Sequence, residues 1–220
     1  MKYYPVLLDL RGKLCVVVGG GRVAERKIRS LLQAGALVKV ISPRLTFSLS
    51  RFKMKGEIIH RQRPFRSTDL HGAFLAIAAT DDRRANERVF GRALDQKIPV
   101  NAVDDPAHSS FIVPSLLQRG DLLIAISTSG KSPALAKALR KKFQKEIGPG
   151  YIFFLKVLGA LRKKIFSMEL GQKRNQAIFR KLVGKDLPLL IQNYDRTRLE
   201  TRIAALFGPG FSLKELGIRR

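Results

Sequence analysis

The sequence predicts an α/β fold, in which a doubly wound parallel sheet is followed by a small antiparallel hairpin and a helical tail. Apolar, strand-like runs alternate with helix-like segments up to about position 103, and a glycine-rich turn follows the first of these runs. Beyond position 150 the apolar residues recur at helical spacing. The chain has 220 residues, of which 45% are hydrophobic, and this is enough to build a substantial core.

The first half contains five strand-like segments joined by crossovers. In chain order the predicted elements are strand 14–18, helix 24–32, strand 37–41, a short helix over 47–54, strand 57–61, strand 74–79, helix 85–93 and strand 98–103. Gly35 is placed to end the first helix. Strands connected in this way lie parallel, and such a sheet binds its ligand at the carboxyl ends of the strands.

A G-x-G-x-x-A motif, Gly19 to Ala24, lies between the first strand and the first helix. Gly19 permits a sharp turn, Gly21 lets the backbone approach a pyrophosphate, and Ala24 allows the helix to pack closely on the strand. The helix N-terminus offers unpaired N–H groups to phosphates. The motif therefore predicts a Rossmann-type dinucleotide site, with a plain strand-turn-helix as the alternative.

Three loops at the carboxyl ends of the predicted strands, residues 19–22, 79–82 and 101–105, are expected to converge on the ligand. The second strand ends in Ser42-Pro43-Arg44, without the carboxylate that commonly binds the ribose hydroxyls. Arg44 is compatible with a 2'-phosphate, with solvation or with a substrate contact, so the choice between NAD and NADP stays open. The predicted cofactor-binding residues are Gly19, Gly21, Arg22, Val23, Pro43, Arg44, Thr80 and Asn101.

The pattern changes after Val103. Segments 115–118 and 121–126 flank an Arg-Gly turn and predict a hairpin. The loop that follows opens a helix, with Ser132 as the N-cap and Pro133 as the first helical residue. A hydroxyl-rich loop at a helix start suits an anion, and an ordinary capped helix is the alternative. The candidate substrate-binding residues in this loop are Ser127, Thr128, Ser129, Lys131 and Ser132.

The tail after Gly148-Pro149-Gly150 is expected to be helical. Its apolar stripes are Phe154, Leu155, Leu158, Leu161 and Ile165, then Ile178, Phe179 and Leu182, then Leu199, Ile203 and Leu206, and Ser212 to Glu215 form a capping box. We expect three parts: a nucleotide-binding domain at 1–113, a dimerisation and substrate-binding segment at 114–150, and a helical C-terminal domain at 151–220.

The chain is strongly basic, with 42 Lys and Arg against 17 Asp and Glu and a net charge of +25. Such a surface attracts anions, which leaves nucleic acid, a polycarboxylate substrate or a simply solvated basic surface as interpretations. Trp is absent and no RNP-type aromatic motif is present, so nucleic acid is disfavoured.

Several classes of protein are not indicated by the sequence. No apolar run reaches the roughly 18 residues of a membrane span, and the N-terminus lacks a signal-peptide core, so we expect a cytoplasmic protein. The single Cys15 lies in the first predicted strand and is interpreted as a buried apolar residue. The sequence contains no Cys or His cluster with metal-site spacing, and we therefore predict no metal-binding residues.

Taken together, these landmarks resemble the precorrin-2 dehydrogenase family, the N-terminal region of siroheme synthases. The residues that carry the resemblance are V-V-V-G-G-G-R-V-A-E-R-K at 16–27, A-A-T-D-D at 78–82, V-N-A-V-D-D-P at 100–106, S-F-I-V-P-S at 110–115 and A-I-S-T-S-G-K-S-P-A-L-A at 125–136. The resemblance covers residues 1 to about 145. The methyltransferase module of siroheme synthases is expected to be absent, because 220 residues leave no room for it.

The resemblance implies NAD-dependent oxidation of precorrin-2 to sirohydrochlorin, followed in some members by insertion of ferrous iron. It also implies a homodimer joined through the middle segment. The implied substrate is an anionic tetrapyrrole, and binding it would explain the net charge of +25 without any role in nucleic-acid binding.

Asp104 follows the last predicted strand, where a base could accept the departing proton, and it matches the family's catalytic aspartate. The alternative is that Asp104 only caps the strand end. Asp105, before a proline, is interpreted as a turn residue, and His108 is not assigned a role. Thr128 matches a serine that can be phosphorylated in some members, although modification of Thr128 is not assumed.

Two alternatives from other classes stay open. In the first, the same fold senses a nucleotide without catalysis, and Asp104 then has no catalytic role. In the second, the basic helical tail binds nucleic acid, which would show as a steep dependence of affinity on salt.

Overall fold

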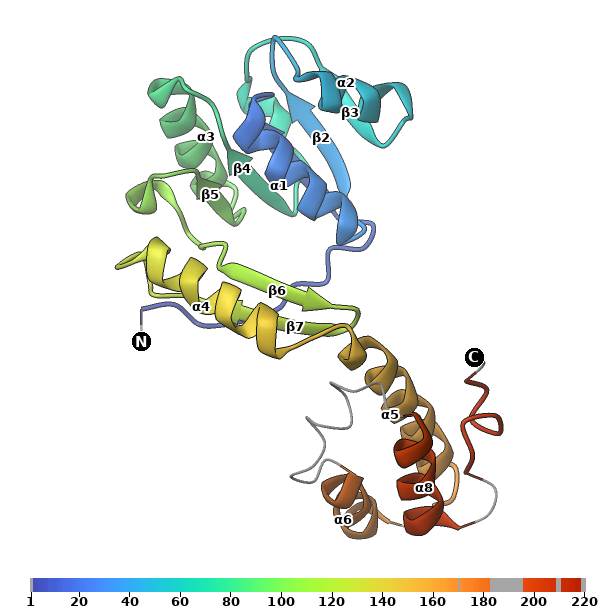
Figure 1. The fold of residues 1–220 in the computed structure, drawn as a ribbon. Helices are drawn as coiled ribbons and strands as arrows, with labels where there is room; N and C mark the ends of the chain where they lie inside the picture. The colour runs from blue at the N-terminus through green and yellow to red at the C-terminus, as the bar shows by residue number, and fades with distance from the viewer. Residues whose placement is uncertain (1, 170, 183–195, 209–210, 219–220) are drawn as a thin grey trace. The chain divides into compact units, whose positions relative to one another are not determined.

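The structure, a computed structural model, describes residues 2–169, 171–182, 196–208 and 211–218. The chain divides into two compact units, residues 1–113 and 114–220 (Figure 1). Within the described residues, no helix is both long enough and apolar enough to cross a membrane.

The first unit is built on one parallel sheet with the strand order β3-β2-β1-β4-β5. Its elements are β1 (Leu14–Val18), α1 (Arg22–Gln33), β2 (Leu37–Ile41), α2 (Phe47–Met54), β3 (Ile58–Arg61), the 3-10 helix η1 (Ser67–Leu70), β4 (Leu75–Ala78), α3 (Arg83–Asp95), β5 (Val100–Ala102) and the 3-10 helix η2 (Pro106–His108). The strand order reverses between β1 and β4, which is where a doubly wound sheet binds its ligand. The predicted α/β fold is confirmed.

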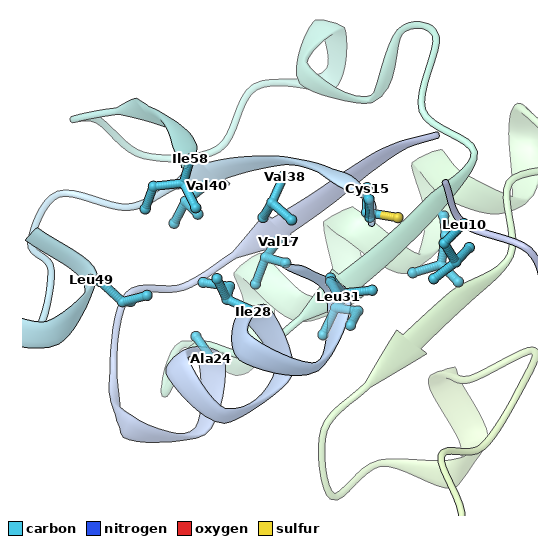
Figure 2. Close-up of a cluster of buried hydrophobic side chains, with 13 residues drawn as sticks. Leu10, Cys15, Val17, Ala24, Ile28, Leu31, Val38, Val40, Leu49 and Ile58 are labelled. Carbon is cyan, nitrogen blue, oxygen red and sulfur yellow. The ribbon is translucent and has the colours of Figure 1, made fainter. Parts of the chain in front are cut away.

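Both faces of the sheet are covered by helices. Val17 of β1 packs with Ile28 of α1 in one buried cluster, which Figure 2 shows. Val18, the next residue, points to the other face and packs in a second cluster with Val89 of α3. Because β1 is buried on both sides, its sequence is a continuous apolar run rather than an alternating one.

The edge strand β5 is shorter than the predicted segment 98–103. The N–H of Ile98 donates to the carbonyl of Ala93 at the end of α3, so this residue closes the helix instead of joining the sheet. On the outer side of β5, the hydroxyl of Ser110 accepts from the N–H of Val100 at 2.8 Å, and that of Ser109 accepts from Ala102 at 2.9 Å. The two serines satisfy a sheet edge that would otherwise be unpaired.

The second unit contains an antiparallel hairpin and helices. Its elements are β6 (Ser115–Arg119), β7 (Leu122–Ile126), α4 (Pro133–Glu146), α5 (Gly150–Phe166), α6 (Gln172–Leu182) and α8 (Arg196–Phe207). The predicted hairpin is confirmed, and α4 packs on it. Arg119 of β6 donates to the carbonyl of Ile147 at 3.1 Å, which links the hairpin to the end of α4.

The helical tail has its own core, and two details differ from the prediction. Val157 of α5, which was not predicted to belong to the apolar stripe, is fully buried. Leu155 and Leu158, which were predicted to belong to it, are only partly buried. Ser212 and Glu215 exchange the hydrogen bonds of a capping box, but the residues that follow form turns and not a regular helix. Ile178 and Phe179 lie in α6 as expected; the side chain of Leu182 is outside the described part.

Candidate functional site

The first unit contains a cavity of about 510 Å³ at the carboxyl ends of its strands. Three chain segments form most of its wall: the turn from β1 into α1, the end of β2, and the loop after β4. The lining residues are Val18 to Val23, Ile41 to Pro43, Pro64, Phe65, Ala79 to Asp82, Ala85 and Arg88. The cavity lies at the point where the strand order reverses, as expected for a nucleotide site in this fold.

The three glycines of the turn have different surroundings. A β-carbon on Gly19, whose φ is +125°, would lie 2.1 Å from the carbonyl oxygen of Ala79. A β-carbon on Gly20 would lie 2.1 Å from the carbonyl oxygen of Arg44. A β-carbon on Gly21 would meet nothing within 4 Å. Gly19 and Gly20 therefore allow the loops to pack, whereas Gly21 leaves open space beside the cavity.

The N-terminus of α1 is not capped by a side chain. By contrast, Thr46 caps α2, Asp82 caps α3 and Ser132 caps α4. The first N–H groups of α1 begin at the glycine turn that lines the cavity, and they are available to an anion. This end of the helix fits the phosphates of a dinucleotide.

Glu25, in the first turn of α1, connects this helix to the β2–α2 loop. Its carboxylate accepts a hydrogen bond from the Thr46 hydroxyl at 2.7 Å and pairs with Arg29 at 2.7 Å. The Thr46 hydroxyl, followed by Arg29, lowers the pKa of Glu25 below its usual value. The ionised carboxylate thus holds two walls of the site together, a role that sequence reasoning missed. The indication of this role in the sequence was the position of Glu25, an acidic residue in the first turn of a helix that was expected to bind an anion.

The loop after β4 is held by a reciprocal pair of hydrogen bonds. The Thr80 hydroxyl donates to the Asn86 side-chain oxygen at 2.9 Å, and the Asn86 amide donates to the Thr80 carbonyl at 2.9 Å. Asp82 then caps α3 by accepting from the N–H of Ala85 at 3.1 Å. The loop is therefore fixed to α3 before any ligand is present.

The end of β2 has no carboxylate facing the cavity. The Ser42 hydroxyl donates to the carbonyl of Arg44 at 2.6 Å, and the His60 Nε2 donates to the Ser42 carbonyl at 2.9 Å. Pro43 lines the cavity and has no N–H to offer. Arg44 is exposed and lines an adjoining cavity.

Asp104 lies just beyond β5 and has a left-handed backbone, with φ of +60°. Its carboxylate is exposed. Lys27 of α1 is close enough to interact electrostatically with it: burial lowers the pKa of Lys27 and Arg26 lowers it further, whereas Asp104 opposes the change. Asp104 thus lies at the same edge of the sheet as the glycine turn, without lining the 510 Å³ cavity.

Asp105 and His108 form a compact turn beside Asp104. One Asp105 oxygen accepts the N–H groups of Ala107 and His108, each at 3.2 Å, and the other accepts from His108 Nδ1 at 2.7 Å. The bond from the His108 ring is the main cause of the lowered pKa of Asp105. The interpretation of Asp105 as a turn residue is confirmed. Among the described residues, no group of three or more His, Cys, Asp and Glu side chains could hold a metal ion.

The loop from Ser127 to Ser132 belongs to the second unit. The Ser127 hydroxyl accepts from the N–H of Ser129, and the Thr128 hydroxyl accepts from the N–H of Ser132, each at 3.0 Å. The Ser132 hydroxyl accepts from Leu135 at 3.2 Å and caps α4 as expected. Lys131 is exposed. The hydroxyls shape the loop, and each retains a hydrogen to donate.

The structure brings most of the predicted cofactor-binding residues together. Those lining the cavity are Gly19, Gly21, Arg22, Val23, Pro43 and Thr80, with Arg44 in the adjoining cavity. Asn101 is different: it is buried, and its amide donates to the carbonyl of Phe111 at 3.0 Å. Sequence reasoning missed Phe65 and Arg88, which also line the cavity. Arg88 lies one helical turn after Ala85, and this spacing was the only indication in the sequence that Arg88 lines the cavity.

Comparison with known proteins agrees with this geometry. Residues 6–115 match the family described as putative NAD(P)-binding, and residues 119–146 match the family described as sirohaem biosynthesis protein central. The solved structure described as SirC, precorrin-2 dehydrogenase, superposes with a TM-score of 0.74 at 27% sequence identity, covering 90% of this chain and 100% of that one.

Curated relatives are named siroheme synthase. That of Photorhabdus laumondii is 37% identical over 193 residues, which are 88% of this chain and 41% of the relative. That of Nitrosococcus oceani is 44% identical over 151 residues, 69% of this chain and 32% of the relative. The chain thus spans less than half the length of these two siroheme synthases. The glycine turn, the cavity and these similarities lead to one conclusion: the chain belongs to the siroheme synthase family of NAD(P)-binding proteins.

Proposed function

We propose that this protein is an NAD-dependent precorrin-2 dehydrogenase, which oxidises precorrin-2 to sirohydrochlorin in siroheme biosynthesis. The observation that carries the proposal is the cavity beside the uncapped N-terminus of α1, in a chain that resembles a solved precorrin-2 dehydrogenase over 90% of its length. A domain that only sensed a nucleotide would need this cavity but would not need Asp104.

The residues that line the cavity would hold the dinucleotide in the way that is usual for a doubly wound sheet. The N–H groups at the start of α1 would bind the pyrophosphate, and Gly21 would leave room for it. Arg22 lines the cavity and adds positive charge. Pro43 and Arg44 would lie at the adenosine end, and Thr80 would lie on the side of β4. Asn101 would not contact the cofactor; its buried amide would hold the segment after β5 in place through its bond to the Phe111 carbonyl.

Asp104 is proposed as the base of the reaction. When bound, NAD accepts a hydride from the macrocycle, and a proton must leave the substrate in the same oxidation. The exposed carboxylate of Asp104, with no hydrogen-bond partner among the described residues, is available to accept that proton. NAD would thus supply the acceptor for the hydride and its two electrons, and the proton would pass through Asp104 to solvent.

The substrate is a polycarboxylate, and the chain carries a net charge of +25. Long-range attraction would concentrate such a substrate at the protein surface. Ser127, Thr128, Ser129, Lys131 and Ser132 are proposed to bind its carboxylates, since Lys131 and the hydroxyl hydrogens are donors. We propose no role in nucleic-acid binding.

Insertion of ferrous iron is a second candidate activity, favoured by the name siroheme synthase of the relatives. In this proposal iron is a substrate, the macrocycle supplies the nitrogen ligands, and Asp104 accepts the protons that leave the ring. The experiment below tests this step separately.

The protein is proposed to be a homodimer joined through residues 114–150. Leu116 and Leu123 lie on one face of the β6–β7 hairpin and are 41% and 37% exposed, while Leu117, on the opposite face, is buried. An apolar face of this kind is suited to a second copy of the hairpin. The three parts 1–113, 114–150 and 151–220 would then serve nucleotide binding, dimerisation with substrate binding, and helical support, in a cytoplasmic protein.

An anaerobic absorbance assay tests the proposed reaction. The purified chain is mixed with enzymatically generated precorrin-2 and NAD, and sirohydrochlorin and NADH are followed together. Formation of both in equal amounts is expected, and ferrous iron is then added to look for siroheme above the rate without protein. Binding of NAD without turnover would favour a nucleotide-sensing domain instead.

A further inference from the structure

A second cavity, also of about 510 Å³, lies beside the nucleotide cavity at the ends of β2 and β3. The two cavities share Pro43, the residue after Ser42 at the end of β2. In a doubly wound sheet, this position lies beside the adenosine ribose. Whatever occupies the second cavity would therefore be attached to, or would lie next to, the ribose end of the cofactor.

The polar side chains that line this second cavity are suited to an anion. Arg44, Ser50, Lys53 and Gln62 all offer hydrogen-bond donors, and no carboxylate lines the cavity. Arg44 and Lys53 are exposed, and among the described residues neither is used in an ion pair or a side-chain hydrogen bond. Two uncommitted cations facing one cavity favour a doubly charged ligand such as a phosphate monoester.

The backbone near Arg44 is held in place before any ligand binds. The Ser42 hydroxyl donates to the Arg44 carbonyl at 2.6 Å, and the His60 ring donates to the Ser42 carbonyl at 2.9 Å. Because Ser42 is already engaged and no carboxylate follows β2, nothing at this position would repel a phosphate on the 2'-hydroxyl. A carboxylate here normally binds the free hydroxyl and disfavours the phosphate.

We propose that this second cavity binds the 2'-phosphate of NADP, with Arg44 and Lys53 as the specificity-determining residues, so that the protein accepts NADP as well as NAD. The inference rests on the proposed dinucleotide site and adds a subsite to it. Arg44 is placed to form paired hydrogen bonds to phosphate oxygens, and Lys53 adds charge from the last turn of α2.

The test compares two probes that differ only in this phosphate. Adenosine 2',5'-bisphosphate and adenosine 5'-monophosphate are titrated into the full chain by calorimetry. The bisphosphate is expected to bind about tenfold more tightly. Lys53→Ala should remove most of that advantage while leaving affinity for the monophosphate within about twofold, and Arg44→Ala should lower affinity for the bisphosphate more than affinity for the monophosphate. Arg51→Ala removes the same charge from α2 outside the cavity and should change neither affinity.

The outcomes separate this inference from the proposed function. Equal affinity for the two probes in the unaltered chain would overturn the 2'-phosphate subsite and leave the nucleotide site standing. Equal losses for both probes in Arg44→Ala would also overturn it, because Arg44 would then serve the ribose or the adenine. If neither probe bound, both the subsite and the proposed nucleotide site would be wrong. Thermal unfolding of each variant verifies that the exposed substitutions leave the fold intact.

Discussion

Gly19 lies against the backbone of Ala79, so that a β-carbon at position 19 would be 2.1 Å from the Ala79 carbonyl oxygen. The contact joins the turn after β1 to the loop after β4, on the two sides of the point where the strand order reverses. The same turn contains Gly21, where a β-carbon would meet nothing within 4 Å. The fold therefore requires a glycine at position 19, whereas the surroundings of Gly21 leave room for a side chain.

Alanine at these two positions should separate stability from binding. Gly19→Ala introduces a backbone clash at φ of +125° and should lower the free energy of unfolding by about 3–5 kcal/mol. Gly21→Ala should change it by less than about 0.5 kcal/mol and weaken NAD binding about tenfold, because the methyl group occupies space left for the pyrophosphate. Urea unfolding and NAD titration measure the two effects. Unchanged NAD binding in Gly21→Ala would contradict this assignment.

Replacing Asp104 by asparagine should remove catalysis and retain the fold. Asparagine tolerates the left-handed backbone at this position, so the change removes mainly the proton acceptor. We expect the turnover rate for precorrin-2 oxidation to fall about 100-fold or more, with the dissociation constant for NAD unchanged. Asp95→Asn, which removes a carboxylate at the end of α3, is the control. Full activity in Asp104→Asn would show that Asp104 is not the base.

The Thr80–Asn86 pair should contribute to both stability and nucleotide binding. Asn86→Ala deletes the bonds that the amide makes with the Thr80 hydroxyl and carbonyl, and it should cost about 1–2 kcal/mol of unfolding free energy. The loop that lines the cavity would then be less ordered, and NAD affinity should fall several-fold. Calorimetry and urea unfolding report the two quantities. If NAD affinity were unaffected, the loop geometry would not matter for binding.

The Arg63–Asp69 pair should make the stability of the first unit depend on pH. Asp69 is 5% exposed. Burial raises its pKa, but the bonds from the Arg63 guanidinium at 2.6 and 2.8 Å and from the Arg66 N–H at 2.7 Å outweigh burial, and the pKa is below its usual value. A lowered pKa means that the carboxylate stabilises the folded state above its unfolded pKa of about 4, and that this contribution is lost as the pH falls through the folded pKa.

Asp69→Asn should therefore destabilise the protein by about 2–4 kcal/mol at pH 7 and progressively less in acid. The measurement is urea unfolding of both proteins from pH 7 to pH 3. An equal difference between the two proteins at every pH would indicate that the loss comes from packing and not from the ion pair.

Cys15 should be unreactive in the folded protein. It is fully buried in β1, and burial raises the pKa of its thiol to about 11, so the reactive thiolate is scarce at neutral pH. An aromatic disulfide reagent should modify the thiol only at the rate at which the first unit opens, and immediately in denaturing urea. Rapid stoichiometric modification in native buffer would contradict the buried position of β1.

The sequence predicted the elements with short-range signals better than those without. Strand β1, the glycine turn and helix α1 follow from an apolar run, a G-x-G-x-x-A motif and helical spacing. The N-cap at Ser132 was equally predictable, because the capping bond spans only three residues. Strand β5 was predicted too long, since its ends depend on hydrogen bonds to α3 and to Ser109 and Ser110, which periodicity does not encode.

The α/β class, the dinucleotide turn and the excess of positive charge could be predicted from the amino-acid sequence, because residue type and local spacing set each of them. Three further features emerged from the folded arrangement: the Ser42 hydroxyl donates to the Arg44 carbonyl, Asn86 holds Thr80, and Arg88 lines the cavity. Residue spacing does not encode these features: Arg88 lines the cavity only because α3 packs beside β4, and the short-range Ser42–Arg44 and Thr80–Asn86 bonds depend on loop conformations that are set by the surrounding unit.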